Sequence, residues 1–544
     1  MQHGAGQISQ EMDSMRAKRF LWTGFALPSL QDVVFISLFL GVVGIGPSML
    51  NVDGDLGRHL TIGNYILTNH TIPTADIFSH TMAGQPLTPH EWLAELFLAL
   101  AYRTGGLNGV VMLSALLIAL TFTLVFQQCL RRSGYASISL GLTVLAAMAA
   151  SLHWLARPHL FTLLLVVLWT GNLEGLRRGE GFHWWVAPLL MVFWANLHGA
   201  FIAGFVLWGI YLLGELWDGR LLQPGWLHKL RKPLSQGPGP SGNQVDQSDS
   251  SQPETKSFLK DYLVMGVLSF GVTLLNPAGL DLWRTSLGFL GNRYLVSHTV
   301  EYLPPNFQEP STWPFLVLIV LSLLVVGRAG RGLKGAHLLL LGAWTAMGLV
   351  SARNIPLYSV LAAPVLGEAA AEGLNRARGF SGLKNLEKRI AIIQTGLYGV
   401  AWPVLVVLGV GLAFSQGVRL DFNQEGNRFS PQIFPVQAVD WLESHPQDGR
   451  AFNYFPWGGY LLYRLWPEQK VFIDGQTDFY GEALTRQYEQ VITLSPGWEG
   501  VLEAYRVDWV IMPAGSELVG ALLEAPGWEM QYQGTTAAIL SRNP

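Results

Sequence analysis

The chain has little charge and almost no cysteine for its length. Only 13% of its 544 residues are charged and the formal net charge is −3, whereas about 25% of the residues of an average globular protein are charged. Nothing in this balance points to nucleic acid, and a single cysteine, Cys129, excludes an intramolecular disulfide framework. Hydrophobic residues make up 50% of the chain and 20 residues are tryptophan. Because indole rings favour membrane–water interfaces, this composition indicates a membrane protein.

Long apolar runs divide the first 415 residues into about eleven candidate membrane spans, since about 20 apolar residues cross a bilayer. The runs are 33–50, 107–129, 135–153, 158–175, 184–197, 199–217, 259–276, 312–327, 336–352, 355–372 and 391–415. The first run is longer than the apolar region of a secretory signal, and a poor cleavage site follows it. We therefore predict an uncleaved anchor.

Lysine and arginine concentrate in alternate loops, which gives the orientation, because these residues are retained on the cytoplasmic side. The pattern predicts a cytoplasmic segment 1–32, a membrane domain 33–415 and an extracytoplasmic domain 416–544 of an inner-membrane protein. Residues 235–257, in an inner loop, are rich in Ser, Gly, Pro and Gln and are predicted to be a disordered linker.

The first outer loop, 51–106, begins with two aspartates, Asp53 and Asp55, directly after the first span. Two carboxylates one residue apart can share a divalent cation, or one can act as a base while the other orients it. His59 and Glu91 lie in the same loop and are candidate substrate ligands. The alternative is that the aspartates form a polar turn or a helix cap.

Two stretches of this loop, 55–67 and 89–103, have apolar residues near helical spacing and are predicted to form amphipathic helices at the interface. A second outer loop, 277–311, has a long polar course with Pro304-Pro305. Loops of this kind often close over a substrate, so we expect a lid.

Polar side chains gather at the predicted outer ends of three further pairs of spans. They are Arg157, His159, Asn196, His198 and Arg353. An outward guanidinium needs a partner, and a lipid phosphate or pyrophosphate matches its fork bidentately. The alternative is that the two arginines extend to ordinary headgroups. The histidine spacing fits no familiar zinc pattern, so no metal site is predicted there.

Residues 431–544 alternate strand-like and helix-like runs, which predicts an α/β layer fold. The strands are expected at 451–455, 470–474 and 508–512, with two closing strands, and the helices at 435–444, 482–493 and 516–524. Trp457 and Tyr460 follow the first strand and Asp474 ends the second, so all three are candidate acceptor ligands. The alternative is that the aromatic rings fill the core.

Together these features resemble the GT-C superfamily of polyprenyl-phosphate-dependent glycosyltransferases, which includes protein O-mannosyltransferases, lipid A aminoarabinose transferases and oligosaccharyltransferases. The acidic motif that follows the first span in that family matches Asp53-Gly54-Asp55. The stretch 455–460 looks like a degenerate W-W-D-Y-G motif of the oligosaccharyltransferases, without its acidic residue.

The resemblance implies a polytopic helical bundle, with one of the two aspartates as base or metal ligand and with Arg157 and Arg353 holding the lipid phosphate. It implies an inverting transfer of a sugar from a polyprenyl-phosphate lipid to an unknown acceptor at the outer face. A divalent cation, Mg²⁺ or Mn²⁺, is an option, and no soluble cofactor is implied. The rivals are a transporter or flippase and a non-enzymatic subunit that displays residues 431–544.

Overall fold

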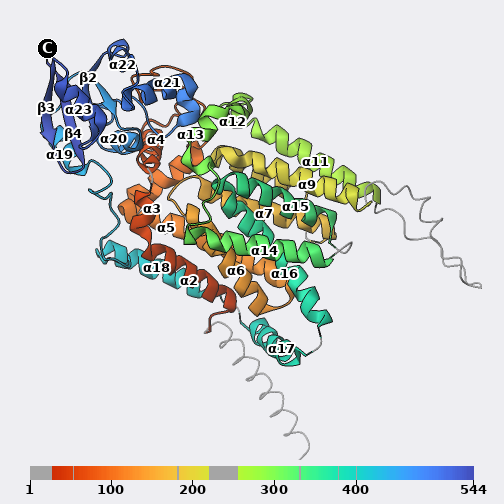
Figure 1. Cartoon of the computed structure of the whole chain (residues 1–544). Helices are drawn as coiled ribbons and strands as arrows, with labels where there is room; N and C mark the ends of the chain where they lie inside the picture. Colours follow the sequence, from red (N-terminus) through yellow and green to blue (C-terminus); the bar gives the residue numbers. More distant parts are fainter. Residues whose placement is uncertain are drawn as a thin grey trace, which may run out of the picture.

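The computed structural model describes most of the chain. It covers residues 27–52, 54–180, 183–219, 255–329, 333–377, 379–397, 399 and 401–543. Asp53, residues 1–26 of the predicted cytoplasmic segment and residues 235–254 of the predicted linker lie outside the described residues. The described part is a helical bundle with a small α/β domain at one end (Figure 1).

The bundle helices follow the apolar runs closely. They are α2 (Leu30–Gly44), α5 (Trp92–Ser133), α6 (Ala136–Ala150), α7 (His159–Arg178), α8 (Val186–Leu197), α9 (Ile202–Trp217), α11 (Thr255–Thr273), α14 (Trp313–Ala329), α15 (Gly335–Val350), α16 (Ile355–Arg376) and α18 (Ala401–Ser415). Within the described ranges, five helical segments are long and apolar enough to cross a membrane, and four more apolar helices are shorter. The count of about eleven spans stays a prediction.

Local sequence explains where several of these helices begin and end. Ser29 and Asp32 form a capping box at the start of α2, in which each side chain bonds to the backbone of the other. Helices α5 and α7 end at Gly134 and Gly179, both in the left-handed conformation that favours glycine.

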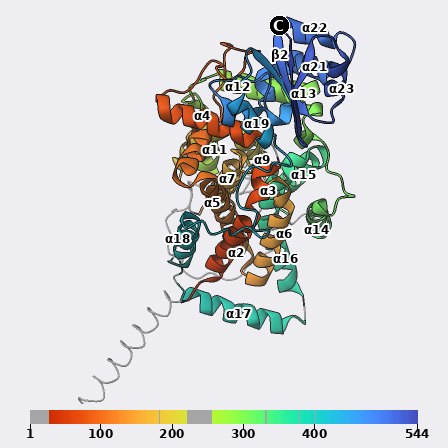
Figure 2. The same cartoon turned by 90° about the vertical axis from the view of Figure 1, so that its left-hand side faces the viewer.

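The structure separates one pair of predicted elements at a kink and divides another predicted element in two. The predicted interfacial helix 89–103 and the predicted span 107–129 follow one another within α5 as two helical segments, separated by a kink at Gly105 and Gly106, where the backbone is not helical. The run 391–415 is not one helix, because α17 (Ser381–Thr395) ends before α18 begins. Figure 2 shows α17 lying across the end of the bundle opposite the α/β domain.

The predicted outer loops contain several helices. The first, 51–106, contains α4 (Asp55–Asn69), as predicted for 55–67, and the short helix α3 (Gly46–Asn51) precedes it, almost wholly within the predicted first span. The apolar side chains of α4 are buried in a core shared with the C-terminal domain, rather than lying at a lipid interface. The predicted lid 277–311 contains α12 (Asp281–Gly291) and α13 (Arg293–His298), which lie near the α/β domain (Figure 1).

The C-terminal domain has one four-stranded sheet. Its strands are β1 (Arg450–Asn453), β2 (Val507–Pro513), β3 (Trp528–Gln533) and β4 (Ala537–Arg542), in the order β1-β2-β4-β3. Strands β1 and β2 are parallel, and the other neighbours are antiparallel. The helices are α19 (Val436–Ser444), α20 (Gly458–Leu465), α21 (Thr477–Ile492), α22 (Trp498–Ala504) and α23 (Glu517–Glu524).

The prediction of a strand at 470–474 is wrong. This segment makes only an isolated bridge, between Val471 and Ser79 of the first outer loop. Its backbone is satisfied instead by the Asn453 side chain, which accepts from Phe472 N at 2.8 Å and donates to the Ile473 carbonyl at 2.9 Å. A side-chain amide therefore takes the place of a neighbouring strand.

Helix α4 and the C-terminal domain meet along glycines. A Cβ atom on Gly57 would collide with the Gly459 carbonyl, and one on Gly54 would collide with the Pro456 carbonyl. A Cβ atom on Gly459 would in turn collide with the Gly54 carbonyl. This seam, formed by Gly54, Gly57 and Gly459, holds the domain directly against the start of α4.

Candidate active site

Six segments bring polar side chains together at the end of the bundle that carries the α/β domain. They are the first turns of α4, the start of α5, the turn before α7, the turn after α8, the segment 299–302 and the turn before α16. The loop 474–478 of the C-terminal domain covers them. Most of the residues predicted from the sequence therefore converge in one region.

Asp55 lies in the first turn of α4, where the partial positive charge of a helix start favours a carboxylate. Its Oδ2 is 2.5 Å from Nη2 of Arg157. The other terminal nitrogen of Arg157 pairs with Oε1 of Glu301. One guanidinium thus joins the predicted catalytic carboxylate to a second carboxylate from the outer loop.

Arg353 reaches the same carboxylate from the other side. Its Nη1 lies 3.5 Å from Oε2 of Glu301 and donates to the Tyr302 hydroxyl at 2.9 Å. Burial alone would raise the pKa of Glu301, but Arg157 and the other cationic neighbours hold it well below its usual value. The two arginines predicted to hold a phosphate therefore share one anionic group, Glu301.

The histidines flank these pairs. His159 Nε2 lies 2.7 Å from the His153 carbonyl, and Nε2 of His153 lies 3.6 Å from Oε2 of Glu301. His198 Nε2 lies 3.3 Å from Nη2 of Arg353 and 3.5 Å from Oε1 of Glu91. Burial and the charge of Arg353 keep the pKa of His198 well below its usual value, so its ring is neutral and can accept from the guanidinium.

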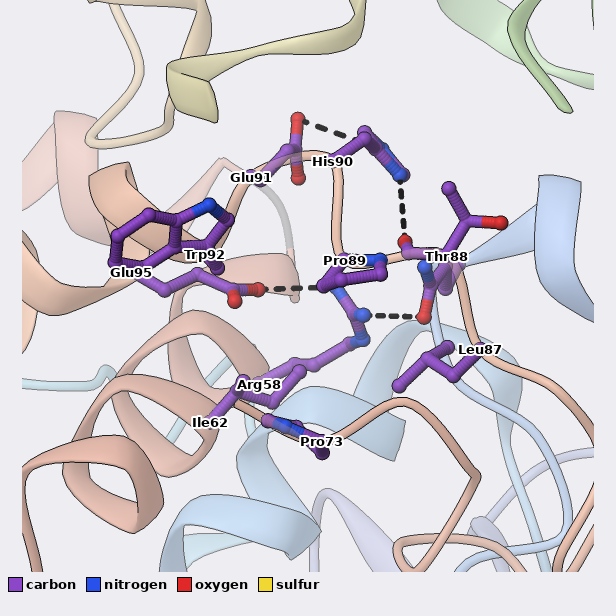
Figure 3. A pocket seen from close by; sticks show the side chains of 11 residues that line it. Arg58, Ile62, Pro73, Leu87, Thr88, Pro89, His90, Glu91, Trp92 and Glu95 are labelled. Carbon is purple, nitrogen blue, oxygen red and sulfur yellow. Dashed lines mark hydrogen bonds and ion pairs between the residues drawn. The ribbon is translucent and has the colours of Figure 1, made fainter. Parts of the chain in front are cut away.

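Glu91 leads into a second cluster, which lines a pocket (Figure 3). His59 Nδ1 lies 3.2 Å from Glu95 Oε1 and 3.9 Å from Glu91 Oε2. Figure 3 shows the Glu95 carboxylate directed toward Arg58, at 3.7 Å, and His90 directed toward Thr88. His59, Glu91 and Glu95 offer ligand atoms that all lie within 4.8 Å of one another.

Arg58 connects this cluster to the C-terminal domain. Its Nε lies 3.5 Å from Asp474 Oδ1, and its Nη2 donates to the Gln476 side chain. Burial would lower the pKa of Arg58, but Asp474, Glu95 and other nearby carboxylates raise it above its usual value. Burial raises the pKa of Asp474, against the opposing effect of Arg58. Arg58 is therefore a permanent cation between the bundle and the domain.

No protein-family model and no curated protein matches the chain, but solved structures do. An Archaeoglobus fulgidus oligosaccharyltransferase tethered to an acceptor peptide matches with a TM-score of 0.54 and 12% identity, over 94% of this chain and 74% of that one. The chain therefore shares its fold with this oligosaccharyltransferase. The resemblance to the GT-C superfamily is thereby confirmed at the level of the fold.

Two further structures match the chain. The oligosaccharyltransferase AglB from Archaeoglobus fulgidus, in complex with an inhibitory peptide and a dolichol-phosphate, has a TM-score of 0.54 and 11% identity over 89% of this chain and 69% of that one. ArnT from Cupriavidus metallidurans, bound to undecaprenyl phosphate, has a TM-score of 0.45 and 14% identity over 94% and 97% of the two chains.

The burial of Trp457 and Tyr460 does not support the prediction that they contact an acceptor. Both rings are buried, at 4% and 1% exposure, in the core beneath the seam. The Trp457 indole donates to the Ile433 carbonyl, and the Tyr460 hydroxyl accepts from Arg464. The aromatic rings fill the core, which was the alternative interpretation of this turn.

Asp474 and Asn196 also have structural partners. Asp474 is 2% exposed and accepts from the Tyr480 hydroxyl at 3.0 Å in addition to its pair with Arg58. Its burial does not fit a direct contact with an acceptor. Asn196 accepts from the Trp92 indole at 2.7 Å and so links α8 to the start of α5.

Sequence reasoning missed the central position of Glu301 and the pairing of Arg58. The only sequence signal for Glu301 was a carboxylate in an outer loop opposite outward arginines, because this segment has no motif. Nothing in the sequence indicates that the C-terminal domain packs against α4 in the position that pairs Asp474 with Arg58.

Proposed function

We propose that this protein transfers a sugar from a polyprenyl-phosphate donor to an acceptor at the outer membrane face. The proposal rests on one observation: Arg157 joins Asp55 to an anion-binding position that it shares with Arg353. The fold shared with oligosaccharyltransferases supports it, and one of these was solved with a dolichol-phosphate. We place the protein in the inner membrane, with residues 416–544 outside.

In the proposed reaction, the acceptor hydroxyl attacks the anomeric carbon of the donor from the face opposite the phosphate. The hydroxyl proton passes to Asp55 or to its neighbour Asp53, and a carbon–oxygen bond to the acceptor forms. The bond from the anomeric carbon to the phosphate oxygen breaks, and its electron pair leaves with the lipid phosphate. The configuration inverts.

The leaving phosphate needs positive charge, which Arg157 and Arg353 supply. Both guanidinium groups now contact Glu301, so a carboxylate occupies the position proposed for the phosphate. A phosphate with two negative charges can replace a carboxylate with one, because charge-assisted hydrogen bonds strengthen with the charge of the acceptor. Arg157 can exchange Glu301 for phosphate while it keeps its pair with Asp55.

The test is turnover of a panel of polyprenyl-phosphate sugars by the purified full-length protein and by its Asp53→Asn and Asp55→Asn variants. Asn keeps the shape of the side chain but cannot take up the proton, so turnover should fall by at least about 10²-fold in the variant that lacks the base. Asp281→Asn is the matched control, since Asp281 lies on α12 with a 63% exposed side chain.

Full turnover in the Asp55→Asn variant would refute its role, and no turnover by the wild type across the panel would refute the enzyme. Movement of an intact lipid-linked sugar across a vesicle membrane, without transfer, would favour the rival transporter. If the protein neither transfers nor transports any of the lipid-linked sugars, the remaining explanation is a non-enzymatic subunit.

A further inference from the structure

Helix α17 crosses the end of the bundle opposite the α/β domain and is attached to it by polar contacts (Figure 2). The Glu387 carboxylate accepts from the backbone nitrogens of Ala136 and Ser137 at 2.6 and 3.0 Å. The partial positive charge at the start of α6 favours a carboxylate in this position. The Gln394 side chain accepts from Leu30 N, at the start of α2, at 2.9 Å. Two bundle helices therefore fix the position of α17.

The apolar side chains of α17 form a stripe that the bundle leaves partly uncovered. The stripe consists of Leu383, Leu386, Ile390 and Ile393, which recur at intervals of three and four residues. Leu386 and Ile393 are 52% and 62% exposed. Because α17 lies across the end of the bundle, it runs along the surface of a membrane that the bundle spans (Figure 2). An apolar stripe on a helix in this orientation is typical of the membrane interface.

The charged side chains that α17 leaves exposed are cations. Glu387 is the one acidic residue of α17, and it is buried against the start of α6. Lys388 and Arg389 are exposed. The Lys384 amino group donates to two carbonyls at the end of α16, at 3.3 and 3.4 Å, so a third cation lies beside them. The outward surface of α17 is therefore positively charged next to an apolar stripe, which complements a membrane surface of anionic lipids.

We propose that α17 lies in the headgroup region of the membrane leaflet opposite the α/β domain and binds anionic phospholipids there. The apolar stripe enters the boundary between headgroups and acyl chains, and Lys388 and Arg389 contact the lipid phosphates. Glu387 and Gln394 hold the helix at the depth where the bundle ends. A second copy of the chain is a poorer occupant, because two positively charged helices repel each other.

The test places a fluorophore on α17 of the full-length protein in lipid nanodiscs. The fluorophore is attached to the cysteine of the Leu386→Cys variant, and Cys129 is buried and resists the label. The nanodiscs contain equal amounts of phosphatidylglycerol and phosphatidylcholine, and one of the two carries a spin label on its acyl chain. Both spin-labelled lipids should quench the fluorescence, and phosphatidylglycerol should quench it more strongly.

The preference for phosphatidylglycerol should depend on the exposed cations. One basic side chain near an anionic membrane surface strengthens binding about fivefold, which corresponds to about 1 kcal/mol. The double substitution Lys388→Gln and Arg389→Gln should therefore remove most of the preference and leave the quenching by phosphatidylcholine. High salt should have the same effect, because salt screens exposed charges.

The α/β domain offers a matched control for the lost charge. Lys470 and Arg506 are exposed there, so Lys470→Gln with Arg506→Gln removes the same charge far from α17. This control should keep the preference of the wild type. A preference that falls equally in both double variants would show that only the net charge matters and would overturn the proposal.

Other outcomes would also contradict it. Quenching by iodide in water, with none by either lipid, would place α17 outside the membrane. Equal quenching by the two lipids would show apolar contact without recognition of the headgroup. Loss of lipid quenching when two copies share a nanodisc would assign the surface to a second copy of the chain.

A second labelling position keeps the result independent of one variant. Ile393→Cys lies on the same stripe and should give the same order of quenching. Thermal unfolding of each variant serves as the folding check. Because no donor or acceptor is present, lipid binding by α17 can fail while sugar transfer is observed, and the reverse can also occur.

Discussion

Replacement of Gly475 by alanine would place a single methyl group between the loop 474–478 of the C-terminal domain and Asp55 of the proposed site. Gly475 follows Asp474 in the loop that covers the start of α4. A Cβ atom at this position would lie 3.0 Å from Oδ2 of Asp55 and would overlap its Oδ1. Gly475 does not have a positive φ angle, so its backbone can accept alanine without conformational strain.

The size of the effect follows from this overlap. Non-bonded heavy atoms are in favourable contact at about 3.5 Å, so Asp55 or the loop must move by about 2 Å to relieve the overlap with Oδ1, which is more than the roughly 1 Å that already affects catalysis. That movement would also lengthen the 2.5 Å ion pair between Asp55 and Arg157. A misplacement of about 1 Å can cost about 10²-fold in rate, which corresponds to about 2.7 kcal/mol of activation free energy.

The assay is steady-state turnover of the lipid-linked sugar donor by the purified Gly475→Ala variant, together with its thermal unfolding. We expect kcat to fall about 10²-fold. Gly520→Ala is the control, because no atom lies within 4 Å of a Cβ at this position on α23. Wild-type turnover by Gly475→Ala would refute the role of Asp55. If the fraction of folded protein fell as much as the activity, Gly475 would contribute to stability alone.

Three further changes test other contacts. Glu301→Gln should lower KM for the lipid donor about fivefold, since a partly exposed ion pair is worth up to about 1 kcal/mol; a higher KM would show that Glu301 positions the arginines. Burial lowers the pKa of His80, whose Nε2 lies 2.8 Å from the Ala451 carbonyl and whose Nδ1 has no partner in the described chain. Its contribution to stability should therefore be present above pH 6.5 and fall below it by up to about 1.4 kcal/mol per pH unit. His80→Gln should remove this slope in pH-dependent unfolding, and an unchanged slope would contradict the assignment. Arg58→Met should cost about 3–5 kcal/mol of unfolding free energy, because it leaves buried carboxylates without their cation; addition of Asp474→Asn should restore part of this loss, and no recovery would show that the two residues are not coupled.

The helices of the bundle could be predicted from the sequence because length and apolar composition determine them locally. The run 158–175 corresponds to α7, and the predicted helix 435–444 corresponds to α19. The segment 470–474 could not be predicted, because its backbone partners are a side chain and a residue about 390 positions away in the sequence. Local β-propensity does not distinguish such a segment from a strand.

The candidate site likewise has residues that could be selected from the sequence and partners that could not. Asp55, Arg157 and Arg353 could be selected because charges at the outer ends of apolar helices are rare and need partners. The partners themselves could not be predicted, since Glu301 and Asp474 are brought in by loops whose docking depends on the whole fold.

The seam of Gly54, Gly57 and Gly459 has a consequence for protein engineering. Because backbone lies directly against backbone there, a C-terminal domain transplanted from another protein would fit only if it brought an equally small residue at position 459. A chimera that carries alanine or serine in the seam would tilt the graft away from α4. Domain exchange in this architecture therefore requires glycine at position 459 of the graft and at positions 54 and 57 of the recipient.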